Sequence, residues 1–226
     1  QSPIPNPQSP IPKNYMEDKY NLSETNTNNS SSKDLNLNIN YTNLNNNDNK
    51  KNNNNSTEKE KEEKISLLMK EILLLTNPEA SEEIINKTPL RYTKALMEFT
   101  SGYNDNIETI IKDAIFPSEN FNDLIIIKDI NFVSTCEHHM LPFFGDCAIG
   151  YIPNEKILGL SKFPRLVNSL SKKFHLQERL TKDIANILEE YLQPRGIIVL
   201  INASHSCMCF RGVKSWGSTT KSIFKL

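Results

Sequence analysis

The feature that most constrains this chain is an asparagine-rich stretch, in which 16 of the 35 positions from Asn21 to Asn55 are Asn. Most of the others are Ser, Thr, Lys or Asp, so the stretch has too little apolar surface to offset the entropy lost on ordering it. The preceding QSPIPNPQSPIP is punctuated by proline, a pattern typical of extended linkers. We therefore predict a disordered low-complexity segment at residues 1–57 and one folded domain at residues 58–226, long enough to bury a core.

The overall charge and hydropathy exclude several classes of protein. The 226 residues carry a formal net charge of −1, which gives no reason to expect nucleic acid as a partner. No apolar run is long enough to span a bilayer, and no signal-peptide pattern opens the chain. We expect a cytoplasmic protein with no membrane partner, whose four cysteines are thiols rather than disulfides. Cys147, isolated from the others, is interpreted as a small buried apolar residue.

The folded part mixes helical and strand patterns without a regular βαβ order. Thr88 is a candidate N-cap for a helix with Pro89 in its first turn, running to about residue 102. Further helices are predicted at 161–174, where Ser161 is the candidate cap, and at 176–193, which is strongly amphipathic. Apolar runs predict strands at 124–134, 143–153 and 196–210. The expected fold class is α+β with an antiparallel sheet.

Two clusters of metal-binding residue types lie in the second half of the chain. In STCEHHMLPF, Cys136 and His139 are three positions apart, which puts them on one side of a helical turn or tight loop. In the last predicted strand, side chains alternate between faces, so His205, Cys207 and Cys209 are expected to point the same way. Thiolates combined with imidazole suit zinc, and the two clusters together predict a zinc site.

The number of protein ligands is open at this point. If Cys209 is a fourth ligand, the site is a closed structural zinc site of the Cys₃His type. If Cys136, His139 and Cys207 act without it, the fourth position is open to water, which is the catalytic arrangement. Two histidines then lie beside the metal without coordinating it, available for proton transfer: His138 and His205.

Taken together, the motifs of this chain resemble the GTP cyclohydrolase I family. The resemblance runs from about Leu67 to Phe224 and is carried by four segments in the family's order: CEHHMLPFFG, GLSKFPRLV, LQERLTKDIA and SHSCMCFRG. The family hydrolyses GTP at purine C8, releases formate and forms 7,8-dihydroneopterin triphosphate, the first step toward tetrahydrofolate or tetrahydrobiopterin. The resemblance implies a zinc enzyme with the tunnelling fold, an antiparallel sheet with helices packed on one face. It also implies a homodecamer of two pentamers.

The family's catalytic centre can be carried over residue by residue. Cys136, His139 and Cys207 match its zinc ligands, and Cys209 falls where the family needs no cysteine. His205 and His138 are expected to deliver the protons that ring opening requires, because imidazole titrates near neutral pH. His205 is expected to be the main donor, since it lies two residues before a zinc ligand on the same strand face. Glu137 is expected to orient its loop by hydrogen bonding.

The substrate contacts of the family can be carried over in the same way. Lys162, Arg165 and Arg211 match cations that bind the triphosphate, and Arg91 matches one contributed across a subunit interface. Glu178 matches the carboxylate that accepts hydrogen bonds from guanine. Two further residues match positions that line the nucleotide pocket: Ser161 and Gln177.

The C-terminal end departs from the family pattern, because VKSWGSTTKSIFKL is shorter than the family's Ser/Thr-rich strand and terminal helix. The departure leaves the local strand register and the stability of a decamer open. It also leaves a second hypothesis open, in which the chain is a non-catalytic zinc-binding oligomeric scaffold of the same fold. Retention of His138, His205 and Glu178 favours the enzyme, since a scaffold needs none of them.

Overall fold

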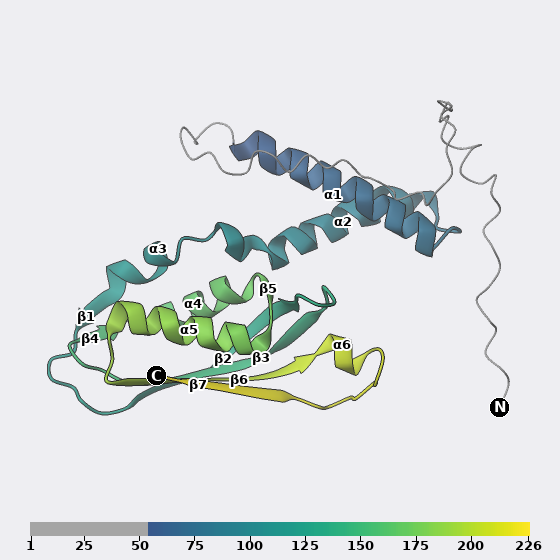
Figure 1. The fold of residues 1–226 in the computed structure, drawn as a ribbon. Coiled ribbons are helices and arrows are strands. Elements are labelled where there is room, and N and C mark those ends of the chain that lie inside the picture. Colours follow the sequence, from purple (N-terminus) through teal and green to yellow (C-terminus); the bar gives the residue numbers. More distant parts are fainter. Residues whose placement is uncertain (1–53) are drawn as a thin grey trace, which may run out of the picture. The chain divides into compact units, whose positions relative to one another are not determined.

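A computed structural model describes residues 54–226 of the chain (Figure 1). The segment predicted to be disordered lies outside these residues, except for its last positions, 54–57, which belong to the first helix. That helix, α1 (Asn54–Thr76), includes a run of charged residues at 58–64 (EKEKEEK), and it contacts α2 (Glu82–Phe99). No helix within residues 54–226 is both long and apolar enough to cross a membrane.

A five-stranded sheet organises the rest of the described chain. Its strands lie in the order β5-β2-β3-β6-β7, and a separate two-stranded sheet pairs β1 with β4. The strands of the large sheet are β2 (Ile125–Cys136), β3 (Pro142–Ile152), β5 (Phe174–His175), β6 (Gly196–His205) and β7 (Thr220–Lys225). The small sheet consists of β1 (Ile115–Pro117) and β4 (Lys156–Leu158).

The helices α4 (Lys162–Ser171) and α5 (Gln177–Leu192) lie on the same face of the large sheet (Figure 1). The predicted amphipathic helix is confirmed, because Leu180, Ile184 and Leu188 of α5 are fully buried against the sheet. Short elements complete the fold: η2 (Ser101–Asn104), α3 (Ile107–Ile111), η3 (Lys112–Ala114) and α6 (Ser206–Cys209). The α+β class is therefore confirmed.

The sheet is not wholly antiparallel, which corrects the predicted arrangement. Its β2–β3, β3–β6 and β6–β7 pairs are antiparallel, but β5 pairs with β2 in parallel. The pairing is short, with Phe174 opposite Thr135 and His175 opposite Cys136. A parallel pair requires a crossover between its strands, and α4 lies in the connection that brings the chain back to the edge of β2.

Several predicted boundaries were wrong. The helix α2 begins at Glu82 and not after Thr88: Ser81 caps it by accepting a hydrogen bond from the Ile84 amide, and Pro89 lies inside the helix. The helix after Ser161 ends at Ser171, and the Ser161 side chain makes no capping hydrogen bond. The last predicted strand is also too long, because β6 ends at His205 and residues 206–209 form the helical turn α6.

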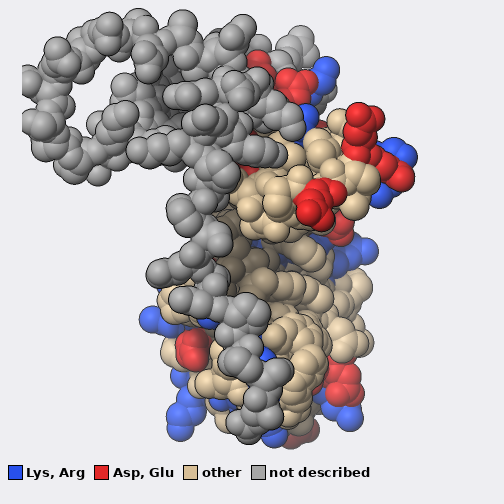
Figure 2. Space-filling view, turned by 90° about the vertical axis from the view of Figure 1, so that its right-hand side faces the viewer, with Lys and Arg blue, Asp and Glu red and all other residues tan. Residues whose placement is uncertain are grey.

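The surface of the described residues carries many exposed apolar side chains. On α1, Leu67 and Leu75 are more than three-fifths exposed, and the sheet exposes Ile126, Ile198 and Ile223. Figure 2 shows uncharged residues over the middle of one side of the molecule, with charged residues mostly toward its margins.

The predicted burial of Cys147 is confirmed, and it has a consequence for thiol chemistry. The side chain is completely buried in β3, and burial, followed by the charge of Asp146, raises the pKa of the thiol from 9.0 to about 12. A rise in this direction lowers the thiolate fraction near neutral pH, and the thiolate is the reactive form.

We therefore expect iodoacetamide to leave Cys147 unmodified in the folded, chelator-treated protein while it modifies the partly exposed Cys207. Peptide mass spectrometry after a timed reaction measures both sites in one sample. Denatured protein is the control, in which all four cysteines should react at similar rates. Equal modification of Cys147 and Cys207 in the folded protein would contradict the assignment of Cys147 to the core.

Candidate metal centre and its surroundings

The first half of the candidate site is a tight turn between β2 and β3. The Leu141 carbonyl accepts a hydrogen bond from the Cys136 amide at 2.8 Å, and the Cys136 carbonyl accepts one from the Met140 amide at 2.8 Å. Met140 adopts a positive φ of 54°, which lets the chain reverse within a few residues. The turn returns His139 over Cys136, and its Nδ1 lies 3.7 Å from the Cys136 sulfur.

The second half of the site comes from the end of β6. Because β2 and β6 are both antiparallel to β3, which lies between them, the two strands run in the same direction and end on the same side of the sheet. Cys136 is the last residue of β2, and Cys207 lies in α6 directly after β6. Sheet topology thus brings together two segments that are far apart in the sequence.

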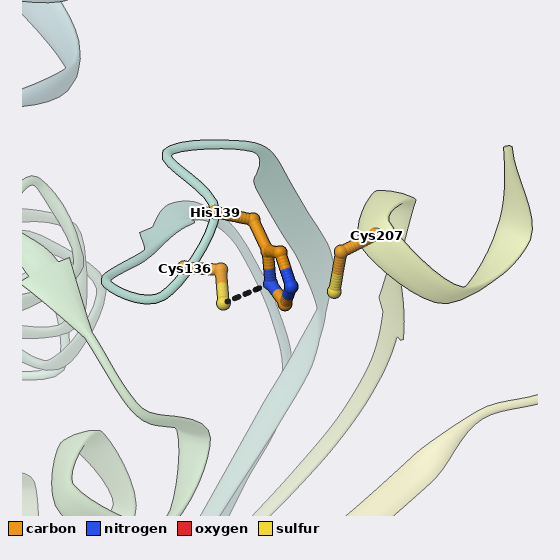
Figure 3. Close-up of side chains that lie close together, drawn as sticks. All are labelled: Cys136, His139 and Cys207. Carbon is orange, nitrogen blue, oxygen red and sulfur yellow. Dashed lines mark hydrogen bonds between the residues drawn. The ribbon is translucent and has the colours of Figure 1, made fainter. Parts of the chain in front are cut away.

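The side chains of Cys136, His139 and Cys207 converge (Figure 3), and one donor atom from each lies within 4.8 Å of the other two. Tetrahedral zinc with its usual Zn–S and Zn–N distances places sulfur and nitrogen donors about 3.6 Å apart. The 3.7 Å between the Cys136 sulfur and His139 Nδ1 matches that spacing. The residues present therefore fit a metal ion with three protein ligands.

Cys209 does not belong to this cluster. The prediction that it shares a strand face with His205 and Cys207 was wrong, because α6 replaces the alternation of a strand with a helical turn. Cys209 is buried. Cys207 is partly exposed to solvent, and its sulfur lies near the donor atoms of Cys136 and His139. Burial, then the neighbouring Cys136 thiol, raises the pKa of Cys207, so metal binding must displace thiol protons here.

His205 is held between two side chains beside the cluster. Its ring stacks on Phe143, with centroids 4.7 Å apart and planes 5° from parallel, and its Nε2 lies 2.8 Å from the Gln177 side-chain oxygen. Partial burial lowers the pKa of His205, and the nearby Glu178 carboxylate opposes this shift. The cluster therefore has an oriented, uncoordinated imidazole next to it.

Glu137 and His138 occupy the turn between the two ligands of the first segment. His138 is exposed, and its ring meets that of His139 edge-on at 6.2 Å. Both Glu137 carboxylate oxygens accept hydrogen bonds from the Arg179 guanidinium of α5, at 2.7 and 3.1 Å. This bidentate contact, first among the causes, lowers the pKa of Glu137. Glu137 thus ties the turn to α5, in keeping with the orienting role expected for it.

Removing the Arg179 guanidinium should therefore loosen the turn and weaken metal binding. Changes to outer contacts of a metal site typically cost 10- to 100-fold in affinity. We expect Arg179→Ala to lie near the lower limit, because the ion pair is partly exposed, with side-chain exposures of 49% and 26%. Competition with a chromogenic chelator measures the zinc affinity. The matched control is Lys182→Ala, which removes another exposed cation of α5. Equal zinc affinities for the two variants would contradict the role assigned to the contact between Arg179 and Glu137.

The predicted phosphate-binding cations are distributed over two helices and the segment after α6. Lys162 and Arg165 lie in the first turn of α4, Arg211 follows α6, and Arg91 lies in α2. No ion pair of the described residues involves any of these four side chains. Ser161 is exposed at the start of α4. Of the remaining predicted pocket residues, Glu178 is exposed at the start of α5, whereas Gln177 is only 1% exposed.

Several residues around the site were not predicted from the sequence. Arg179, Phe143, Thr181 and Ser222 all make contacts that hold site residues in place. Arg179 lies within the LQERL motif, where its charge next to Glu178 was the only available signal. The contacts of Phe143 and Ser222 depend on strand pairing across the sheet and have no local pattern.

A mixed α+β fold with a Cys₂His cluster and a neighbouring histidine defines a class of candidate metalloenzymes. The sequence model of the GTP cyclohydrolase I family matches residues 65–225, which is most of the chain. The chain therefore belongs to the GTP cyclohydrolase I family, as its motifs predicted.

Individual relatives give the same assignment. The chain is 44% identical over 152 residues to "GTP cyclohydrolase 1" of Dictyostelium discoideum, covering 67% of this chain and 65% of the relative. It is 45% identical over 159 residues to "GTP cyclohydrolase 1" of Saccharomyces cerevisiae, covering 70% of this chain and 65% of the relative. The chain thus spans somewhat less than two thirds of the length of each. Among solved structures, archaeosine synthase QueF-Like in the apo form aligns with a TM-score of 0.38 and 18% identity, over 45% of this chain and 91% of the other.

Proposed function

We propose that this chain is a GTP cyclohydrolase I, which hydrolyses GTP at purine C8, releases formate and forms 7,8-dihydroneopterin triphosphate. The observation that carries the proposal is the convergence of Cys136, His139 and Cys207 in a chain whose family match spans residues 65–225. The relatives named GTP cyclohydrolase 1 support the same reaction. The product would enter tetrahydrofolate or tetrahydrobiopterin synthesis.

Zinc is the metal that we propose for the cluster. Two thiolates and one imidazole suit zinc, and three protein ligands leave a fourth position open, as in catalytic zinc sites. When bound there, zinc lowers the pKa of a coordinated water toward neutrality and so makes a nucleophile available. The chain itself must then supply proton transfer and substrate binding.

Proton transfer is assigned to the two uncoordinated histidines. Opening the imidazole ring of the purine requires protons at the departing nitrogens, and an imidazole can deliver them near neutral pH. His205 is the main donor in this proposal, because its ring is oriented by Phe143 and Gln177 beside the ligand Cys207. His138, exposed on the turn, is the second.

The substrate is bound through its two ends. A carboxylate at Glu178 can accept from both N1–H and the exocyclic amine of guanine, a pair that adenine does not offer. We assign the triphosphate to Lys162, Arg165 and Arg211, whose charges are not used in ion pairs with other described residues. Lys162 and Arg165 also lie at the N-terminus of α4, where the helix dipole favours anions.

We further propose that the protein has the tunnelling fold and works as a homo-oligomer, a decamer of two pentamers. The apolar side chains exposed on α1 and on the sheet are candidates for subunit contacts. Arg91 would reach the triphosphate of a neighbouring subunit. The catalytic domain is assigned to residues 58–226, and the four free thiols are in keeping with a reducing compartment such as the cytoplasm.

Incubating the zinc-loaded protein with GTP tests the proposal. Formate release should accompany a product that becomes a fluorescent pterin after oxidation, and ATP should give neither. The alternative of a non-catalytic zinc scaffold predicts zinc binding without formate. If the zinc-loaded protein released no formate from GTP, the enzyme assignment would be overturned and the scaffold hypothesis would be favoured.

A further inference from the structure

Gln177, the first residue of α5, has an unusual environment for a residue expected to line a nucleotide pocket. Gln177 is only 1% exposed, and both polar atoms of its side chain have hydrogen-bond partners. The side-chain nitrogen donates toward the Ile201 carbonyl at 3.1 Å, the Thr220 carbonyl at 2.9 Å and the Ser222 hydroxyl at 3.0 Å. The side-chain oxygen faces His205 Nε2 at 2.8 Å.

These contacts fix the direction of each hydrogen bond. Backbone carbonyls only accept, so the Gln177 atom that faces Ile201 and Thr220 must be the amide nitrogen. The amide oxygen is therefore the atom that faces His205, and the His205 Nε2–H must donate to it. The neutral ring then carries its lone pair on Nδ1, which has no hydrogen-bond partner among the described residues.

Two hydroxyl groups close this network. Thr181 Oγ1 donates to the Gln177 backbone carbonyl at 2.7 Å, and it lies 2.6 Å from the Ser222 hydroxyl. With the Thr181 proton used in this way, Ser222 donates to Thr181, and toward the Gln177 amide Ser222 can only accept. The amide has two N–H groups for its three acceptors, so one N–H is shared between two of them. Ser222 and Thr220 belong to β7, so the C-terminal strand holds the carboxamide from the side opposite His205.

We propose that Gln177 is a positioning residue, which holds His205 in the Nε2–H form so that Nδ1 is the nitrogen that exchanges a proton with substrate. The inference rests on the proposed function and deepens it. It also assigns β7 to the support of the catalytic centre, although this strand lies at the edge of the sheet. Gln177 acts through His205 in this proposal and does not itself contact the nucleotide.

A double-substitution experiment separates the two roles. Gln177→Met keeps the length of the side chain and removes its hydrogen bonds, and His205→Ala removes the group that Gln177 holds. We expect Gln177→Met to lower kcat by about 10- to 100-fold, the range typical for contacts that orient a functional group. It should leave KM for GTP and zinc content unchanged. In the His205→Ala background, the same substitution should lower kcat by less than about twofold.

A residue that contacts substrate gives the opposite result: Gln177→Met would raise KM and would have the same effect with or without His205. That outcome overturns the inference. Wild-type protein assayed in parallel distinguishes failure of this inference from failure of the proposed function. If zinc-loaded wild-type protein released no formate, the proposed GTP cyclohydrolase activity itself would be rejected.

A milder variant keeps the test valid if Gln177→Met fails to fold. Ser222→Ala removes the hydrogen bonds that Ser222 makes with the Gln177 amide and with Thr181. Only one of them reaches the Gln177 side chain, and a single hydrogen bond corresponds to about a two- to tenfold effect on kcat. Lys221→Ala, at the neighbouring exposed position of β7, is the matched control and should keep wild-type kcat. Equal kcat values for Ser222→Ala and Lys221→Ala would overturn the role assigned to β7.

Discussion

Cys207→Ala should abolish both zinc binding and formate release, whereas Cys209→Ala should keep both. The two cysteines are two positions apart in α6, but only Cys207 belongs to the donor cluster with Cys136 and His139. Without Cys207, the remaining two donors come from a single turn, which is too few for a stable zinc site. Cys209 is buried and is not one of the clustered donors, so we expect it to contribute only packing.

Metal analysis by mass spectrometry and formate release should be measured on the same preparations of both variants. Cys209→Ala is the matched control for Cys207→Ala, because both variants replace a cysteine by alanine within the same helical turn, α6. Loss of zinc from both variants to the same extent would indicate a closed site with four ligands. In that case the metal would be structural, and the catalytic assignment would lose its main support.

His205→Ala should retain zinc and GTP binding but lose most turnover. The ring of His205 is held by Phe143 and Gln177 and is not one of the three clustered donors, so the metal site should survive. General acid–base groups contribute about 10²- to 10⁴-fold in rate, and turnover to the pterin should fall within that range. GTP affinity should change little, because the proposal assigns binding to the cations and Glu178.

Zinc content, GTP affinity by calorimetry and formate release test the three parts of this prediction separately. The matched control is His138→Ala, which removes the other uncoordinated imidazole and should cost less, because His138 is exposed and has no orienting hydrogen bond to any residue that the structure describes. Loss of zinc along with activity in His205→Ala would make His205 a ligand or a structural support. The division of roles in the site would then be wrong.

The parts of the fold that could be predicted are those with a local signature. The amphipathic repeat of α5 and the apolar runs of β2 and β3 are each complete within one segment, so their positions were close to correct. The start of α2 was missed because Thr88-Pro89 is itself a typical helix start. Ser81, followed by two glutamates, is an equally good start and is the one that the chain uses.

The donor set was predicted through residue types and resemblance, and only partly through geometry. The turn that joins Cys136 to His139 follows from their spacing. The strand alternation used for Cys207 and Cys209 was wrong, because nothing in SHSCMCF distinguishes the end of a strand from the start of a helical turn. Zinc as the metal and the catalytic role of His205 remain proposals.

The supporting contacts could not be predicted, because they join residues that are remote in the sequence. Arg179 reaches Glu137 across 42 positions, and Gln177 reaches Ser222 across 45. Each contact exists only once the sheet has paired, since β6 and β7 must be in register before Gln177 has acceptors. β6 supplies the Ile201 carbonyl, and the C-terminal strand β7 supplies the Thr220 carbonyl and the Ser222 hydroxyl.

Zinc titration of the chelator-stripped protein, with formate release measured at each step, tests the central proposal most directly. If the chain is a zinc-dependent GTP cyclohydrolase with one Cys₂His site, turnover should rise in proportion to bound zinc and reach its plateau at one zinc per chain. Zinc that binds in that ratio without any formate release would contradict the enzyme assignment, and formate release from the metal-free protein would contradict the role of the metal.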